Sequence, residues 1–209
     1  MSDSEQLYRL LAQIGAVISN SHVVYTSGRH GSAYINKDAI YPHAGLTRLL
    51  CRKIADHFRK HDIEVVLGPA LGGIILSQWV SHQLSEQTTR EILGVYADKT
   101  EGSGFVIKRG YDKLITRKNV LIVEDVLNTG GSVKNLVESA RRLGANIVAV
   151  AALCNRGAVT SEMIGQVPEL YSLIHVSMES WEENDCPLCI QKIPINTTVG
   201  KGLEFVSKR

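Results

Sequence analysis

Two adjacent carboxylates, Glu124 and Asp125, follow a run of apolar residues and precede a loop of small and hydroxyl residues. Adjacent acidic groups at the end of a strand repel each other unless a cation or the hydroxyls of a ligand engage them. Residues 129–132 supply backbone N–H groups and hydroxyls at the expected start of a helix, which suits a phosphate group. Carboxylates beside a phosphate cradle indicate a sugar phosphate as the ligand.

Segment 119–132 resembles the binding motif of the phosphoribosyltransferases that use phosphoribosyl pyrophosphate (PRPP): an apolar strand, two acidic residues and a Thr/Gly/Ser loop. The resemblance implies that the acidic pair holds the ribose hydroxyls and that the loop holds the 5-phosphate. The PRPP-binding residues that it implies are Glu124, Asp125, Val126, Leu127, Asn128, Thr129, Gly130, Gly131, Ser132, Lys99, Lys108 and Arg109. The alternative is an ordinary turn with an N-cap serine and a chance acidic pair.

A second glycine-bearing loop follows the apolar run 64–68 and also opens a helix. Its glycines permit close approach of the backbone to an anion. No Gly-Lys-Ser/Thr follows to complete a Walker loop, and the spacing does not fit a Rossmann fingerprint. The resemblance implies that Ala70, Leu71, Gly72 and Gly73 form the pyrophosphate loop, and a purely structural turn is the alternative.

The acceptor base is indicated by segment 25–37, which resembles the Ser-Gly-Arg segment and following strand of the orotate phosphoribosyltransferases. In those enzymes this segment belongs to a hood that covers the base, and an arginine in the position of Arg156 contacts the pyrimidine. A guanidinium suits the planar recognition of a carboxylate, although a surface ion pair is the alternative for Arg156. The orotate-binding residues implied are Arg156, Asn128, Tyr34 and Lys37. The chain departs from the common pattern at Thr26, where many members carry Lys, and at Asn128, where they carry Thr; Lys37 is expected to compensate for the first.

The polar, glycine-bearing segment 97–110 is expected to be a mobile lid that closes over the pyrophosphate. It carries Lys99, Lys108 and Arg109 and lacks the His of the common orotate enzyme. Lys99 and Asp125 are the predicted catalytic residues, and Mg²⁺, bound through Asp125 or through water, is the implied cofactor. A solvated β-hairpin with an exposed cationic end is the alternative. The resembled enzymes complete their sites across a homodimer, whereas the residues alone permit a monomer equally well.

Hydrophobic periodicity indicates the elements that must position these residues. Apolar strands are expected at 64–68, 119–123 and 147–153, and helices at 5–18, 46–58, 73–84 and 132–143. Uninterrupted apolar strands that alternate with helices predict an α/β fold with a doubly wound parallel sheet flanked by helices, as in type I phosphoribosyltransferases. Extended pieces at 22–26 and 33–36, separated by a turn at 27–31, form the expected small N-terminal hood. A single domain over 1–209 is predicted, with the hood at about 1–40, the core at about 41–180 and an irregular C-terminal tail at about 181–209.

Composition excludes several other classes of protein. The 209 residues are 44% hydrophobic and 21% charged, which is typical of a globular chain and not of a disordered one. The net charge of +2 is too weak a field to favour nucleic acid as a partner. No apolar run reaches the roughly 18 residues that a membrane span needs, and residues 1–6 do not read as a secretion signal. Four cysteines indicate a reduced, cytoplasmic chain.

Cys186 and Cys189 form a CxxC pair in the tail. Structural zinc needs four ligands, so Cys154, His175 or a partner chain would have to complete the set, and zinc is not the expected occupant. The seven histidines show no metal-ligand spacing with a second histidine, and His30 and His43 are expected to be surface or hydrogen-bonded residues.

Together, the resemblance implies transfer of the phosphoribosyl group of PRPP to orotate, giving orotidine 5'-monophosphate and pyrophosphate. Two alternatives stay open at this point. A phosphoribosyltransferase for another base would share both phosphate loops, and a non-catalytic regulator could use the same fold to sense PRPP or nucleotides.

Overall fold

The computed structural model describes residues 3–25, 27–102, 104–176 and 179–208 of the chain. These residues fall into two compact units, each with its own contacts. Unit 1 joins residues 1–42 to residues 177–209, and unit 2 comprises residues 43–176. The N-terminal hood segment and the C-terminal tail therefore fold into the same unit.

Unit 2 is built on a six-stranded sheet, counted over the described residues, with the strand order β10-β9-β8-β5-β6-β7. Neighbouring strands are parallel except for β7, which runs antiparallel to β6 at the edge. The strands are β5 (Val65–Pro69), β6 (Leu93–Lys99), β7 (Phe105–Val106), β8 (Asn119–Leu127), β9 (Asn146–Asn155) and β10 (Leu170–His175).

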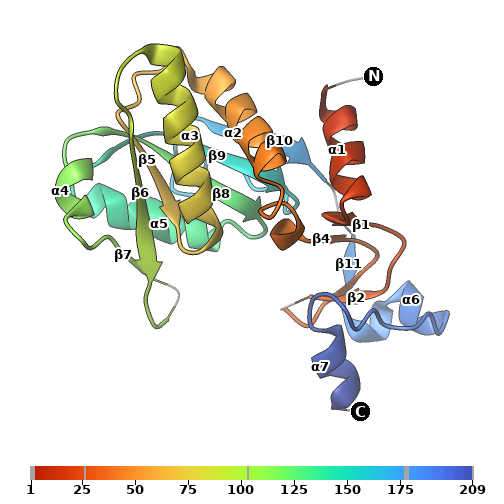
Figure 1. Cartoon of the computed structure of the whole chain (residues 1–209). Helices are drawn as coiled ribbons and strands as arrows, with labels where there is room; N and C mark the ends of the chain where they lie inside the picture. The colour runs from red at the N-terminus through yellow and green to blue at the C-terminus, as the bar shows by residue number, and fades with distance from the viewer. Residues whose placement is uncertain (1–2, 26, 103, 177–178, 209) are drawn as a thin grey trace. The chain divides into compact units, whose positions relative to one another are not determined.

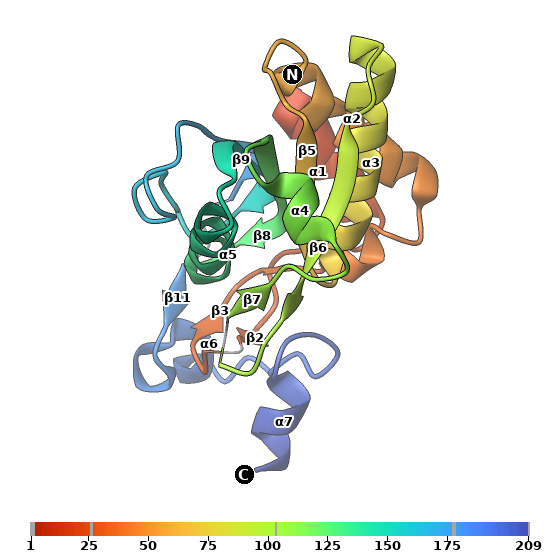
Figure 2. The same cartoon turned by 90° about the vertical axis from the view of Figure 1, so that its left-hand side faces the viewer.

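Helices cover both faces of this sheet, as Figures 1 and 2 show. Helices α2 (Ala44–Phe58) and α3 (Gly72–Thr88) pack together, and α3 lies on β5, β6 and β8. Helix α5 (Gly131–Arg142) packs on the opposite face, against β8 and β9, and the short α4 (Tyr111–Ile115) leads into β8. Strand β5 is buried along its whole length because both of its faces are covered, as the uninterrupted apolar run predicts. The predicted doubly wound α/β class is confirmed.

The helices of unit 2 form where apolar residues recur at three and four. In α5 the buried side chains are Val133, Leu136, Val137 and Ala140, which share one stripe and join the core cluster under the sheet. The predicted helices at 46–58, 73–84 and 132–143 are confirmed to within a few residues at each end.

Two small sheets and several short helices make up unit 1. Strands β1 (Val17–Ile18) and β4 (Tyr34–Ile35) pair with each other, and β3 (His30–Gly31) lies between β2 (Val23–Val24) and β11 (Ser180–Trp181). The helical elements are α1 (Asp3–Gln13), η1 (Lys37–Ala39), η2 (Glu183–Asp185), α6 (Pro187–Ile190) and α7 (Gly202–Ser207). The two ends of the chain are joined by the pairing of β3 with β11 and by backbone bonds from Asn196 to His22 and from Lys201 to Val24.

The structure corrects several expected boundaries. The first helix ends at Gln13 and not at residue 18, because Gly15 has φ +71° and the Ala16 N–H returns to the Leu11 carbonyl, which is a helix-ending arrangement. The expected turn at 27–31 contains β3, so only its first part turns. Strands β6 and β10 were not expected at all.

None of the helices within the described residues has the length and apolar character needed to cross a membrane.

Candidate functional site

The carboxyl ends of four neighbouring strands meet at one edge of the unit 2 sheet. Strand β5 pairs in parallel with β6 and β8, and β8 pairs in parallel with β9. Lys99 is the last residue of β6, and the loop at 70–73, the loop at 128–130 and Arg156 follow the carboxyl ends of β5, β8 and β9. Ligands of open parallel sheets bind at this edge, so the topology brings the predicted PRPP residues of unit 2 to one place.

Glu124 and Asp125 belong to strand β8 itself, which corrects the expectation that they follow the strand. Both are buried, with 9% and 4% of their surface exposed. Glu124 Oε1 accepts the Asp125 N–H at 3.0 Å, and Asp125 Oδ1 accepts the Val126 N–H at 2.7 Å. Because successive side chains of a strand point to opposite faces, the two carboxylates leave β8 in different directions.

The loop that follows β8 opens helix α5 through Gly130. Gly130 has φ +78° and precedes the helix, and its carbonyl accepts the first helical N–H bond, from Lys134 at 2.9 Å. Asn128, Thr129 and Ser132 are exposed around this start, whereas Val126 is partly buried and Leu127 is fully buried. The N–H groups of the first turn of a helix favour an anion, so this loop has the chemistry of a phosphate cradle.

The loop between β5 and α3 is held tightly at its base. A Cβ on Gly68 would lie 2.0 Å from the Gly73 carbonyl oxygen, and a Cβ on Gly73 would lie 2.5 Å from the Pro69 ring. These two glycines are therefore required for packing, whatever else the loop does. The Ala70 N–H is bonded to the Ala97 carbonyl at 2.8 Å, and Leu71 is 83% exposed. The pyrophosphate role of Ala70, Leu71, Gly72 and Gly73 stays a prediction.

The segment expected to be a lid is a β-hairpin, which was the alternative interpretation. Asp98 pairs with Val106 and Lys99 with Phe105. The expectation that the segment is too polar for the core is wrong in part, because Ala97, Phe105 and Ile107 are buried in the core cluster of unit 2. Ser103 lies outside the described residues.

The three cations of the hairpin are exposed, but they differ in their contacts. Arg109 donates to Asp98 at 3.2 Å, and its guanidinium lies 5.6 Å from the centre of the Tyr96 ring, so it is held at the base of the hairpin. Lys99 ends β6 at the carboxyl edge of the sheet, and Lys108 follows β7.

Arg156 is positioned by the loop after β9. Its N–H is bonded to the Leu127 carbonyl at 3.0 Å, and a Cβ on Gly157 would overlap the Asn128 carbonyl oxygen. The structure thus brings Arg156 beside the phosphate loop that contains Asn128. Burial raises the pKa of the Cys154 thiol to about 11, partly opposed by the Arg156 charge, so this thiol is neutral at neutral pH.

Tyr34 and Lys37 lie in unit 1, on β4 and η1, and each is partly buried. Their role toward orotate stays a prediction. In the Ser-Gly-Arg segment, Arg29 donates to the Ser180 hydroxyl at 3.0 Å and pairs with Glu182, so this arginine holds strand β11. Thr26 lies outside the described residues.

The CxxC pair is joined by two histidines that the sequence did not single out as a pair. Four side chains, named here the Cys2His2 cluster, have ligand atoms within 4.8 Å of one another: His22, His30, Cys186 and Cys189. The sequence pointed to Cys154, His175 or a partner chain for the remaining ligands, whereas the structure places His22 and His30 beside the two cysteines. The sequence did contain a signal: two histidines, His22 and His30, lie in the expected N-terminal hood, and a CxxC lies in the tail. The pairing of β2 with β3 shows that the two histidines are neighbours in space.

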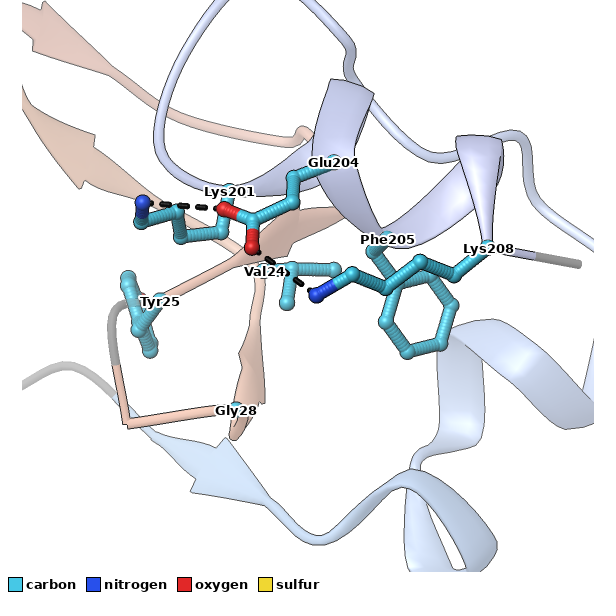
Figure 3. Close-up of a pocket in the computed structure, with 7 residues that line it drawn as sticks. All are labelled: Val24, Tyr25, Gly28, Lys201, Glu204, Phe205 and Lys208. Carbon is cyan, nitrogen blue, oxygen red and sulfur yellow. Dashed lines mark hydrogen bonds and ion pairs between the residues drawn. The ribbon is translucent and has the colours of Figure 1, made fainter.

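Unit 1 also contains a shallow pocket of about 200 Å³, shown in Figure 3. Its residues are Val24, Tyr25, Gly28, Lys201, Glu204, Phe205 and Lys208. Glu204 forms ion pairs with Lys201 at 2.9 Å and with Lys208 at 2.9 Å, and these two lysines lower the pKa of Glu204 to about 2. The three charged side chains of the pocket are paired with one another, so they give no reason to assign a charged ligand to it.

Comparison with known proteins identifies the family of this chain. The Phosphoribosyl transferase domain family matches residues 36–183. A curated orotate phosphoribosyltransferase of Thermoanaerobacter sp. (strain X514) is 33% identical over 200 residues, covering 92% of this chain and 95% of the relative. That of Pelotomaculum thermopropionicum is 34% identical over 192 residues, covering 91% and 94%.

A solved structure of the orotate phosphoribosyltransferase of Mycobacterium tuberculosis H37Rv shares the fold, with a TM-score of 0.65 at 22% identity over 84% of this chain and 97% of that one. The same protein has also been solved in complex with PRPP. The chain belongs to the phosphoribosyltransferase domain family. Within that family, its curated relatives at 33% and 34% identity carry the name orotate phosphoribosyltransferase.

Proposed function

We propose that this protein is an orotate phosphoribosyltransferase, which transfers the phosphoribosyl group of PRPP to orotate and releases pyrophosphate. The observation that carries the proposal is the sequence match to curated orotate phosphoribosyltransferases along nearly their whole length, 95% in the Thermoanaerobacter relative. The structure adds two carboxylates near the end of β8 and a loop that opens helix α5 beside them. Likeness to solved structures at 22% identity supports the fold and does not select the base.

PRPP is proposed to lie across the carboxyl edge of the unit 2 sheet. The exposed loop of Asn128, Thr129 and Ser132 would hold the 5-phosphate at the start of α5. The oxygens of Asp125 and Glu124 would accept the ribose hydroxyls near the carboxyl end of β8. The loop at 70–73, held by Gly68 and Gly73, would present backbone N–H groups to the pyrophosphate. This order places C1 of the ribose between the two phosphate loops.

Mg²⁺ fits the donor set at this edge. Asp125 and Glu124 offer carboxylate oxygens at a strand end, the hard ligands that Mg²⁺ prefers, and Mg²⁺ commonly keeps several waters while bound through one or two carboxylates and substrate phosphates. When bound, the ion would neutralise charge on the departing pyrophosphate. The protein's own part is to fix the ring through Asp125, whose Oδ1 is already held by the Val126 N–H.

Substitution at C1 builds positive charge on the ribose and negative charge on the leaving group. Lys99, exposed at the end of β6, is proposed to approach the pyrophosphate and stabilise that negative charge. Arg156 is proposed to pair with the orotate carboxylate or a carbonyl, because its backbone is held against Leu127 at the phosphate loop. Tyr34 and Lys37 would complete the base site. Closure of the hairpin tip would exclude water, which otherwise hydrolyses PRPP.

The setting of the reaction is also a proposal. The described cysteines are all free thiols, which suits a reducing compartment, and we place the protein in the cytoplasm. The working unit is proposed to be a homodimer, with PRPP and orotate as small-molecule partners and no nucleic acid or membrane.

The test is a panel of bases. The full chain is incubated with PRPP, Mg²⁺ and one base at a time, and pyrophosphate release and nucleotide formation are measured. Turnover with orotate, and little with adenine, hypoxanthine or uracil, is expected. Turnover with another base and none with orotate would make the protein a transferase for that base. PRPP binding by calorimetry without turnover on any base would favour the regulator.

A further inference from the structure

Two ring nitrogens and two thiols converge inside unit 1. His22 Nε2 lies 2.9 Å from His30 Nδ1 and 3.6 Å from each of the two sulfurs, and Cys189 Sγ lies 3.3 Å from His30 Nδ1. His22, His30 and Cys186 are buried, at 2%, 0% and 0% exposure, and Cys189 is partly buried. Buried imidazole nitrogens need a partner, and a metal ion would supply one to both rings here.

The separations match a tetrahedral metal site. Zinc binds sulfur at about 2.3 Å and imidazole nitrogen at about 2.0 Å, so tetrahedral ligands lie about 3.5 Å apart for a sulfur–nitrogen pair and about 3.3 Å for two nitrogens. Four of the six distances between ligand atoms in the Cys2His2 cluster run from 2.9 to 3.6 Å, and all four atoms lie within 4.8 Å of one another. A set of two sulfurs and two nitrogens in this arrangement is typical of Zn²⁺.

Local structure orients these ligands. His22 Nδ1 lies 2.7 Å from the Ile193 carbonyl and donates to it, which leaves the lone pair on Nε2, the atom that faces the cluster. Cys186 caps the N-terminus of α6 and Cys189 lies one turn later, so the short helix turns both sulfurs to the same side. The Phe205 ring stands edge-on to His30 with centroids 5.0 Å apart and covers it.

We propose that unit 1 holds a structural zinc ion on the Cys2His2 cluster, through His22 Nε2, His30 Nδ1, Cys186 Sγ and Cys189 Sγ. All four positions are filled by protein, so no position is open for water or substrate, and the ion serves folding and not catalysis. The ion would join the hairpin of β2 and β3 to helix α6. His30 in the hairpin and Cys189 in α6 are 159 residues apart in sequence. The ion therefore fixes the two ends of the chain as one unit. This proposal does not rest on the transferase activity.

Metal content of the full chain, purified without a histidine tag, tests the proposal. Elemental analysis is expected to find about one zinc per chain in the wild type and less than about a tenth of that in the Cys186→Ser/Cys189→Ser double variant. Matched controls are Cys51→Ala, whose thiol is buried in α2, and His43→Asn at the start of the same helix. Both controls are expected to keep the wild-type zinc content.

A second measurement covers the case in which the double variant fails to fold. The wild type grown with Co²⁺ is expected to show the visible absorption of tetrahedral cobalt bound to thiolates, and chelation is expected to remove that absorption and to lower the melting temperature. Wild-type chain without zinc and without the cobalt spectrum would overturn the proposal. So would stoichiometric iron in place of zinc, a Cys186–Cys189 disulfide in the wild type, or full zinc content in a folded double variant.

Discussion

Gly157 and Asn128 touch through their backbones: a Cβ on Gly157 would fall 1.4 Å from the Asn128 carbonyl oxygen. This contact joins the loop that carries Arg156 to the loop proposed to hold the 5-phosphate. The Arg156 N–H, bonded to the Leu127 carbonyl at 3.0 Å, fastens the same two loops one residue earlier. The proposed base site and the proposed phosphate site therefore cannot move independently.

Gly157→Ala is expected to displace the phosphate loop, because no methyl group fits at that distance from a carbonyl oxygen. The KM for PRPP should rise about tenfold or more while the core stays folded, which corresponds to about 1.4 kcal/mol of lost binding. Steady-state kinetics and thermal unfolding measure the two effects. Gly45→Ala, in helix α2 with nothing within 4 Å of the added Cβ, is the matched control: it should leave the KM for PRPP unchanged and should not lower the melting temperature. Unchanged PRPP kinetics in Gly157→Ala would show that the contact does not position the site.

Asp125→Asn is expected to leave the fold intact and to reduce turnover by orders of magnitude. The amide oxygen can still accept the Val126 N–H, now made at 2.7 Å, so the change removes the charge and little else. Glu124→Gln should reduce turnover less, because the amide oxygen of Gln can still accept the Asp125 N–H and a ribose hydroxyl. Calorimetry with PRPP and pyrophosphate release are the measurements. Asp62→Asn is the control, because this exposed carboxylate bonds Asn119 at the opposite end of β8. Full activity and unchanged PRPP affinity in Asp125→Asn would remove the central role given to the acidic pair.

The sequence was sufficient for the α/β class because the signals were local. The uninterrupted apolar run at 64–68 and the three-and-four spacing in α5 reflect burial on two faces and on one stripe, and both need only neighbouring residues to be read. Strand β6 was not predicted because Gly94 and Asp98 interrupt its run of apolar residues. Gly94 is required by packing, since a Cβ there would lie 2.6 Å from the Ser81 hydroxyl. That reason lies in the tertiary structure.

The candidate sites divide in the same way. The acidic pair and phosphate loop are contiguous, so residues 124–132 could be proposed from sequence. The Cys2His2 cluster could not be assembled, because its histidines lie more than 150 residues from its cysteines and are brought to them by the pairing of β3 with β2 and β11. The side-chain directions of Glu124 and Asp125 could not be predicted either. They depend on β8 continuing to Leu127, and the two acidic residues made the strand seem to end at residue 123.

Arg156→Ala is expected to raise the KM for orotate much more than the KM for PRPP. A hydrogen bond to a charged group contributes about 1.5 to 3 kcal/mol, which is roughly a 10- to 150-fold change in KM. Arg59→Ala, at the exposed end of α2, is the control for loss of one surface charge and should leave both constants unchanged. Equal rises in both constants would instead mean that Arg156 supports the phosphate loop through its contact with Leu127.

Thiol labelling is expected to divide the four cysteines by unit. Burial raises the pKa of Cys51 to about 12 and that of Cys154 to about 11, against about 8.5 for an ordinary thiol. At pH 8 only about one in ten thousand Cys51 thiols is ionised, and the thiolate is the reactive form. Burial and the neighbouring Cys186 raise the pKa of Cys189 as well, but Cys189 is the one partly exposed thiol among the four, so native protein freed of metal should react with iodoacetamide first at Cys189, and added zinc should protect it. Peptide mapping that found Cys51 labelled before Cys189 in folded protein would contradict this order.

The last prediction concerns the hairpin and the proposed homodimer. Arg109 is bonded to Asp98 at the base and Phe105 is buried, whereas Lys99 is exposed, so Lys99 and the tip that follows it are the part of the hairpin proposed to reach another subunit. If the tip acts in trans, mixing inactive Asp125→Asn chains with inactive Lys99→Ala chains creates one intact site in each mixed dimer. Random exchange makes half of the dimers mixed, so about a quarter of the wild-type activity should return. Native mass spectrometry verifies the exchange. No recovery after proven exchange would mean that the hairpin serves its own subunit, and a monomer in sedimentation at the assay concentration would reject the dimer as well.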